Sequence, residues 1–128
     1  MDRLARAVNI DDLRALAQRR LPRMVFDYID GGADDEVTLR RSVDRFRDYI
    51  LSYDTLVDIA AIDTKRSVMG APMRLPFFIS PTAASRLFHI SGEPAVARAA
   101  HQAGIVYSIS TLGSTSIEDI AKATPGPK

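Results

Sequence analysis

Small and hydroxyl-bearing residues follow two short apolar stretches of this sequence. Phe77-Phe78-Ile79 leads into Ser80-Pro81-Thr82-Ala83, and Ile105-Val106-Tyr107-Ser108-Ile109 leads into Ser110-Thr111. Hydroxyl and backbone groups supply hydrogen bonds, and small side chains leave room for a flat ligand. Two interpretations are open at this point: the residues form a ligand-binding surface, or they only fit the tight turns that follow strands.

The two apolar stretches have the length and composition of buried strands, and a helical segment lies between them. That segment runs from Glu93 to Ala103 and ends at Gly104. Strand, helix and strand predict a βαβ unit with parallel strands. Both strands then end on one side, where ligands bind in α/β sheets and barrels. We therefore expect residues 80–83 and 110–111 to share one surface.

Two helices are predicted at the start of the chain. Asn9 is a suitable N-cap for an amphipathic first helix, because apolar residues recur after it at helical spacing. Pro22 suits the first turn of a second helix, Arg23 to Asp30. Gly31-Gly32 is expected to end that helix.

A third helix is predicted before any strand of the main sheet. Asp34 or Asp35 is expected to cap it, and it runs to about Phe46. Asp48 to Pro76 is predicted to be an extended connector with one or two short strands, arranged as a hairpin. A capping box is predicted for the last helix, formed by Ser116 with Asp119 or by Thr115 with Glu118.

The composition excludes several kinds of site and partner. The 128 residues include no cysteine, which excludes disulfides, thiolate nucleophiles and cysteine metal sites. A net charge of +1 gives no general reason to expect nucleic acid as a partner. No signal peptide is evident, and no apolar run approaches the ~20 residues of a membrane-spanning helix. We expect a cytoplasmic protein, with peripheral attachment at the inner face of a membrane left open.

Few other side chains offer catalytic chemistry. His89 and His101 have no partner at metal-ligand spacing, so no metal site is predicted. His101 falls inside a helix and is expected at the surface, whereas His89 lies in the loop after the first strand. Tyr28, one turn before Gly31-Gly32, fits either a packing role or a place beside a ligand. The phosphate loop, the nucleophile elbow and the dinucleotide glycine fingerprint do not occur.

Several motifs occur together, in one order, along nearly the whole chain from about Asn9. They are Leu21-Pro22-Arg23-Met24-Val25-Phe26-Asp27-Tyr28, Gly31-Gly32-Ala33, Thr38-Leu39-Arg40, Ile79-Ser80-Pro81-Thr82-Ala83, Gly92-Glu93, Ala97-Arg98-Ala99-Ala100, Ser108-Ile109-Ser110-Thr111 and Ser116-Ile117-Glu118-Asp119-Ile120-Ala121. In these motifs the chain resembles the FMN-dependent 2-hydroxy acid oxidase and dehydrogenase family, which includes glycolate oxidase, L-lactate dehydrogenase, mandelate dehydrogenase and flavocytochrome b2.

The resemblance implies an α/β fold, the N-terminal portion of a TIM (β/α)8 barrel preceded by about three helices. Residues 1–76 are then the helices and connector that cover the barrel, and residues 77–128 are its first two βα units. Two parallel strands do not make a covered sheet. We therefore expect the remainder of the barrel to come from a second polypeptide or from a missing C-terminal part.

The resemblance also assigns roles to residues of this chain. Tyr28 matches the family tyrosine that hydrogen-bonds the substrate carboxylate or the reacting oxygen, so it is the expected catalytic and substrate-binding residue. Pro81, Thr82 and Ala83 match the segment that lies against the flavin ring. Ser110 matches the hydroxyl residue that contacts FMN. The resemblance implies no metal.

The implied reaction is oxidation of a lactate-like L-2-hydroxy acid to a 2-oxo acid with FMN as the electron acceptor. The family's histidine base and carboxylate-binding arginine lie on later strands, so this chain alone is predicted to be inactive. The expected partners are a small-molecule 2-hydroxy acid, the remainder of the barrel, and further copies in a homo-oligomer, tetrameric or larger.

Two departures from the family pattern and two alternatives accompany this hypothesis. Leu112 stands where short-chain glycolate oxidases often have tryptophan, and the familiar His-Pro-Glu-Gly turn reads His89-Ile90-Ser91-Gly92. One alternative is another FMN-barrel enzyme, such as an isomerase, in which Tyr28 need not touch the substrate. The other is a non-catalytic fragment that complements a partner chain.

Overall fold

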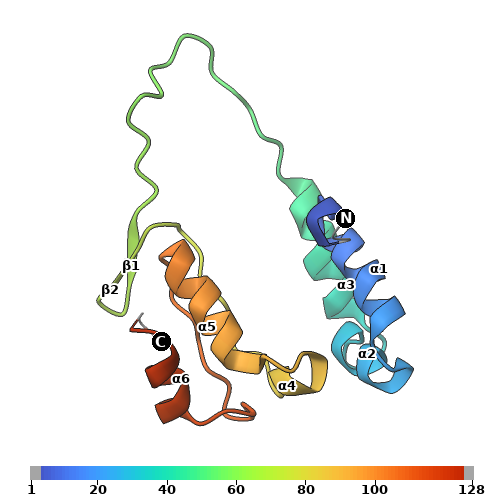
Figure 1. Cartoon of the computed structure of the whole chain (residues 1–128). Coiled ribbons are helices and arrows are strands. Elements are labelled where there is room, and N and C mark those ends of the chain that lie inside the picture. The colour runs from blue at the N-terminus through green and yellow to red at the C-terminus, as the bar shows by residue number, and fades with distance from the viewer. Residues whose placement is uncertain (1–3, 126–128) are drawn as a thin grey trace. The chain divides into compact units, whose positions relative to one another are not determined.

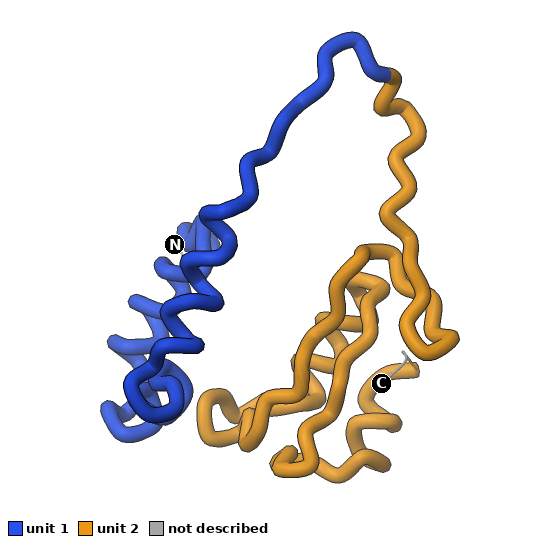
Figure 2. The backbone as a smooth tube through the Cα atoms, turned by 180° about the vertical axis from the view of Figure 1, so that it is seen from behind, with its two compact units in different colours: residues 1–57 blue, residues 58–128 orange. Residues whose placement is uncertain are grey.

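The computed structural model describes residues 4–125 and divides the chain into two compact units, Met1–Val57 and Asp58–Lys128, coloured separately in Figure 2. The elements of the first unit are η1 (Leu4–Arg6), α1 (Ile10–Arg20), α2 (Arg23–Asp30), α3 (Val37–Asp44) and η2 (Arg45–Asp48), and its three α-helices are labelled in Figure 1. Those of the second are β1 (Arg66–Val68), β2 (Ala71–Met73), α4 (Ser85–Phe88), α5 (Gly92–Ala103) and α6 (Ile117–Ala123).

Helix α1 begins as the sequence predicts. Asn9 has an extended backbone, and its side-chain oxygen accepts a hydrogen bond from the Asp12 amide at 2.8 Å. This bond satisfies one of the unpaired amides of the first turn. Acidic residues in the first turn and basic residues in the last turn complement the helix dipole.

Helix α2 has the predicted bounds, but its glycines act in an unexpected way. Gly31 has φ −80° and donates its amide to the Asp27 carbonyl at 3.0 Å, so the helix ends without a left-handed residue. A Cβ added to Gly31 would lie 2.9 Å from the Asp27 oxygen. A Cβ added to Gly32 would lie 3.0 Å from the Cβ of Leu39 in α3. The glycines therefore permit close packing at this turn.

Helix α3 begins later than predicted, at Val37, and its N-cap is Glu36. Asp34 and Glu36 both have left-handed backbones, with φ of 48° and 57°. The Glu36 carboxylate turns back and accepts the Gly32 amide at 3.1 Å. The prediction that Asp34 or Asp35 caps this helix is wrong, because both residues belong to the turn that precedes it.

A connector without helix or strand runs from Tyr49 to Lys65, and all of its residues are exposed. It leads into an antiparallel hairpin of β1 and β2, in which Arg66 faces Met73 and Val68 faces Ala71. Met69 and Gly70 form the hairpin turn, and both have positive φ, which is the pattern of a two-residue type I′ turn. The hairpin predicted between Asp48 and Pro76 is therefore confirmed.

The predicted parallel pair is present in the second unit. Ile79 and Tyr107 form a parallel bridge. The Ile79 amide donates to the Val106 carbonyl at 3.0 Å, and the Ser108 amide donates to the Ile79 carbonyl at 2.9 Å. Helix α5 connects the two segments and ends, as predicted, at Gly104, which has φ 69°. The pairing is limited to this bridge, so neither segment is a full strand.

Helices α5 and α6 pack together in the second unit (Figure 1). The buried core cluster between them and the second apolar stretch is Ala97, Ala100, Ile105, Tyr107 and Ile120. Ser116 caps α6 by accepting the Asp119 amide at 3.2 Å, so the first of the two predicted capping pairs is confirmed. Among the described residues, no helix has the length and apolar character needed to cross a membrane.

Candidate functional site

The loops that follow the paired segments lie side by side, as the sequence predicts. The Ala84 amide donates to the Leu112 carbonyl at 3.0 Å. The Arg86 amide donates to the Ser114 hydroxyl at 3.1 Å. Residues 80–86 and 110–115 are therefore joined directly at the ends of the parallel segments.

The predicted flavin contacts lie on these two loops. Pro81 and Thr82 are exposed, while Ala83 and Ser110 are half-buried. The Ser110 hydroxyl accepts the Leu112 amide at 3.2 Å, which leaves its own hydrogen as a donor. The structure thus places four of the five predicted site residues on one pair of joined loops. Small exposed residues with hydroxyl donors suit contact with a flat, polar ring system.

Glu93 bonds both of these loops, in a role that the sequence analysis did not predict. Its side chain is fully buried in the first turn of α5. Oε1 accepts the amides of Ser85 at 3.1 Å and Ser114 at 2.8 Å. Oε2 accepts the hydroxyls of Ser114 and Thr115, each at 2.8 Å. The sequence feature that could have pointed to this role is an acidic residue placed between two hydroxyl-rich loops.

The Glu93 carboxylate is ionised at neutral pH despite its burial. Loss of solvation raises its pKa, but hydrogen bonds from the Ser114 amide, its own backbone amide and the hydroxyls of Ser114 and Thr115 outweigh that effect and lower the pKa to about 2. Donors that bond a carboxylate stabilise its charged form. The result is a buried negative charge compensated by dipoles.

Tyr107 lies beside this charge with its side chain buried. Its hydroxyl has no hydrogen-bond partner of acceptable geometry among the described residues. Burial raises the pKa of Tyr107, the Glu93 charge raises it further, and the Ser85 side chain acts in the opposite direction. The phenol is therefore neutral at physiological pH.

An open groove of about 490 Å³ lies in the second unit, along α4 and α5. It is lined by Thr82, Ser85, Phe88, His89, Gly92, Ala95, Val96 and Ala99. Of the predicted site residues, only Thr82 is part of its lining. Nδ1 of His89, an exposed side chain, accepts the Ser91 amide at 3.2 Å. The predicted exposure of His101 is confirmed.

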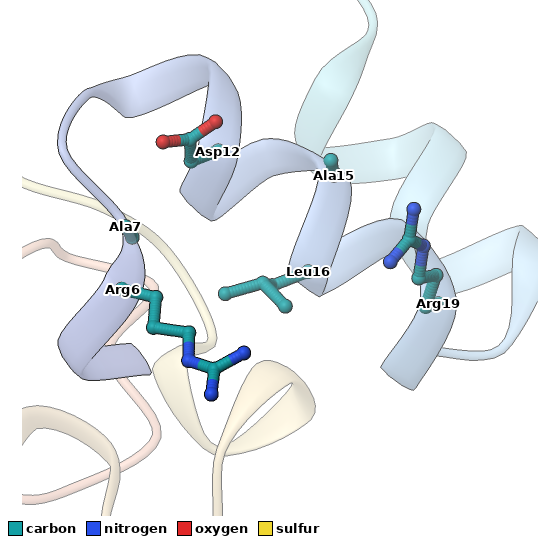
Figure 3. A pocket seen from close by; sticks show the side chains of 6 residues that line it. All are labelled: Arg6, Ala7, Asp12, Ala15, Leu16 and Arg19. Atoms are coloured by element: carbon teal, nitrogen blue, oxygen red, sulfur yellow. The ribbon is translucent and has the colours of Figure 1, made fainter. Parts of the chain in front are cut away.

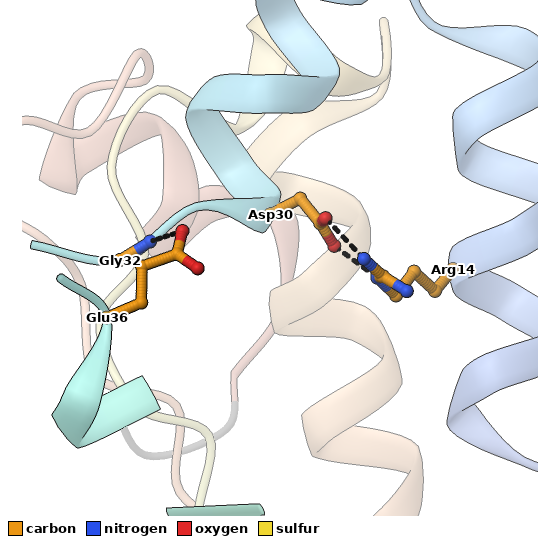
Figure 4. Close-up of polar contacts among 4 residues, drawn as sticks. All are labelled: Arg14, Asp30, Gly32 and Glu36. Carbon is orange, nitrogen blue, oxygen red and sulfur yellow. Dashed lines mark hydrogen bonds and ion pairs between the residues drawn. The ribbon is translucent and has the colours of Figure 1, made fainter. Parts of the chain in front are cut away.

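Tyr28 belongs to α2 in the first unit, with 61% of its surface exposed. The end of this helix is tied to α1 by a two-pronged ion pair, drawn in Figure 4: Arg14 Nε lies 2.5 Å from Asp30 Oδ1, and Nη2 lies 2.7 Å from Oδ2. The hydrogen bond from Arg14 lowers the pKa of Asp30. The C-terminal end of a helix carries a partial negative charge, which disfavours a carboxylate such as that of Asp30. The positive charge of Arg14 offsets this repulsion.

A second open pocket, of about 380 Å³, lies along α1 (Figure 3). Its lining is Arg6, Ala7, Asp12, Ala15, Leu16 and Arg19. The Asp12 carboxylate accepts the Val8 amide at 3.0 Å. None of the predicted site residues lines this pocket. The residues from 4 to 125 contain no group of acidic and histidine side chains that could hold a metal ion.

Comparisons with known proteins agree with the motifs. Residues 17–128 match the family described as FMN-dependent dehydrogenase. A putative L-lactate dehydrogenase of Mycobacterium tuberculosis is 47% identical over 123 residues, which are 96% of this chain and 30% of that protein. A peroxisomal (S)-2-hydroxy-acid oxidase of Oryza sativa is 40% identical over 116 residues, 91% of this chain and 32% of that protein.

The fold of the chain is also similar to that of solved structures. The chain is similar to a soluble mutant of the membrane-associated (S)-mandelate dehydrogenase from Pseudomonas putida, with a TM-score of 0.84 and 39% identity over 92% of this chain and 34% of that one. Paired parallel segments joined by a helix place the second unit among α/β proteins. The chain belongs to the FMN-dependent dehydrogenase family. It spans about a third of the length of these relatives.

Proposed function

We propose that this chain is part of an FMN-dependent enzyme that oxidises a lactate-like L-2-hydroxy acid to a 2-oxo acid. The observation that carries the proposal is the junction of the loops at 80–86 and 110–115 in a member of the FMN-dependent dehydrogenase family. The relatives named above act, by their names, on lactate, on 2-hydroxy acids and on mandelate.

The loops supply the groups that such a cofactor needs from this chain. FMN, when bound, accepts the two electrons released by the hydroxy acid. Pro81, Thr82 and Ala83 form a small, largely exposed segment that lies against the ring in this proposal, and Ser110 donates its free hydroxyl hydrogen. Tyr28 orients the substrate by hydrogen-bonding its carboxylate or its reacting oxygen.

The proposed architecture is a TIM barrel, of which residues 77–128 are the first two βα units and residues 1–76 the covering helices and connector. The remaining strands supply the base and the arginine that pairs with the substrate carboxylate. In this proposal the enzyme is a homo-oligomer, tetrameric or larger. It is cytoplasmic, with peripheral attachment to the inner face of a membrane as the alternative, since one structural relative is described as membrane-associated.

The test is co-expression of this chain with a polypeptide that supplies the later strands. We expect a complex whose flavin absorbance bleaches under nitrogen on addition of L-lactate or L-mandelate, but not of the D-acids. Flavin retained without any bleaching would contradict the dehydrogenase assignment and favour another FMN-barrel enzyme. A complex that binds no flavin would favour a non-catalytic role.

A matched pair of tyrosine variants tests the role of Tyr28 in the same complex. Tyr28→Phe removes one hydroxyl and should lower turnover about tenfold or more with flavin retained, because one transition-state hydrogen bond is lost. Tyr53→Phe, in the exposed connector, is the control and should be unchanged. Equal turnover in both variants would remove Tyr28 from the proposed mechanism.

A further inference from the structure

Polar contacts, rather than apolar packing, position the two loops. Ser80 and Thr111 are exposed, and Leu112 has 71% of its surface exposed. None of the residues of the core cluster lies on either loop, although Ile79 and Ile109, which directly precede the loops, pack against it. Within the loops themselves no side chain is buried, and the contacts that join them are hydrogen bonds.

Apart from the direct bond between the Ala84 amide and the Leu112 carbonyl, the contacts that join the loops converge on one side chain. Glu93 bonds Ser85 on the first loop and both Ser114 and Thr115 on the second. The Ser114 hydroxyl donates to the carboxylate while it accepts the Arg86 amide at 3.1 Å, so it links both loops to Glu93. Hydrogen bonds to a charged acceptor are about twice as strong as neutral ones.

We propose that Glu93 is a positioning residue whose buried carboxylate sets the spacing between the segment at 80–83 and Ser110. The importance of this spacing rests on the proposed function, in which the flavin ring lies against both loops. Glu93 itself does not touch the flavin. It acts through the backbone of both loops.

Glu93→Gln separates this role from simple packing, because glutamine keeps the shape and one carbonyl oxygen but loses the charge. Amide hydrogen exchange of the 128-residue chain, resolved by residue, is the measurement. We expect the amides of Ser85 and Ser114 to exchange about tenfold faster or more, since both donate to the carboxylate. The amides of Ile79 and Ser108 join the parallel segments directly and should change much less.

Two results would overturn the proposal. Unchanged exchange at Ser85 and Ser114 would mean that the charge does not hold the loops. Equal acceleration at all four amides would mean a general loss of stability. Glu118→Gln, the same change at an exposed carboxylate in the first turn of α6, is the matched control and should leave both loop amides unchanged.

A second variant keeps the test decisive if Glu93→Gln does not fold. Thr115→Val removes one hydroxyl from the carboxylate at nearly constant volume. It should accelerate exchange at Ser114 more than at Ile79, and no local difference would count against the proposal. These readouts need no flavin. Failure of the co-expressed complex to bind FMN would therefore contradict the proposed function alone.

Discussion

The two units are stabilised by different kinds of interaction. In residues 4–57 the buried apolar side chains are Val25 and Phe26, and the ion pairs lie at the surface. The second unit has a buried cluster centred on α5 and a fully buried, multiply bonded carboxylate. Exposed ion pairs contribute little because water and salt screen them. Substitutions of the same kind should therefore have unequal effects in the two units.

The largest expected difference comes from one apolar change made in each unit. Ile120→Ala removes a fully buried side chain of the core cluster and should lower the free energy of unfolding by about 3 kcal/mol. Ile10→Ala, at the start of α1, changes a side chain that is 77% exposed and should cost about 0.5 kcal/mol or less. Urea unfolding followed by circular dichroism checks both. Equal losses would contradict the contrast between the units.

Acid should loosen the second unit through Glu93. Its folded pKa of about 2 lies below its ordinary value of 4.5, so the carboxylate contributes stability above about pH 4.5 that is lost as the pH falls through 2. The measurement is the urea midpoint of the chain as a function of pH. Glu93→Gln should flatten this dependence, and an unchanged slope in that variant would assign it to other groups.

A smaller and opposite effect is expected at Tyr107. Tyr107→Phe removes a buried hydroxyl that has no hydrogen-bond partner among the described residues, and should raise the free energy of unfolding by about 1 kcal/mol. Thermal unfolding is a sufficient measurement, with Tyr53→Phe as the exposed control. Destabilisation by Tyr107→Phe would show that the hydroxyl has a partner, either the Ser85 side chain or a buried water.

The smallest effect should come from the ion pair of the first unit. Asp30→Asn weakens the contact of α2 with Arg14. We expect a slight loss of α1 helicity at low salt, and no difference from wild type at high salt, where exposed charges are screened. Circular dichroism across a salt series measures this. A loss of helicity that persists at high salt would indicate that the ion pair stabilises α1 more than an exposed pair is expected to.

Features with local causes could be predicted from the sequence. The caps at Asn9 and Ser116 each need only a side chain and an amide three residues away, and both are present. Gly104 ends α5 because glycine adopts a left-handed backbone without strain. The parallel pairing of the segments near Ile79 and Tyr107 followed from strand length and an intervening helix.

Features that depend on distant partners were missed. Glu93 stands in one of the family motifs, but its partners Ser114 and Thr115 follow it by 21 and 22 residues, and only the folded chain brings them together. Helix α3 begins late because the Glu36 side chain turns back and accepts the Gly32 amide. Helix propensities do not predict such a contact. The roles of Tyr28 and of the flavin-contacting residues stay predictions.

The exposed connector also determines where proteases should first cleave the chain. Leu51, Tyr53 and Leu56 are each at least 87% exposed and lie outside any helix or strand. An enzyme such as chymotrypsin, which cleaves after large apolar residues, should cut there well before it reaches the buried residues of α5. Mass spectrometry of the first fragments would locate the cut. Protection of the same peptide bonds after another polypeptide is added would give a direct footprint of its contact with the connector.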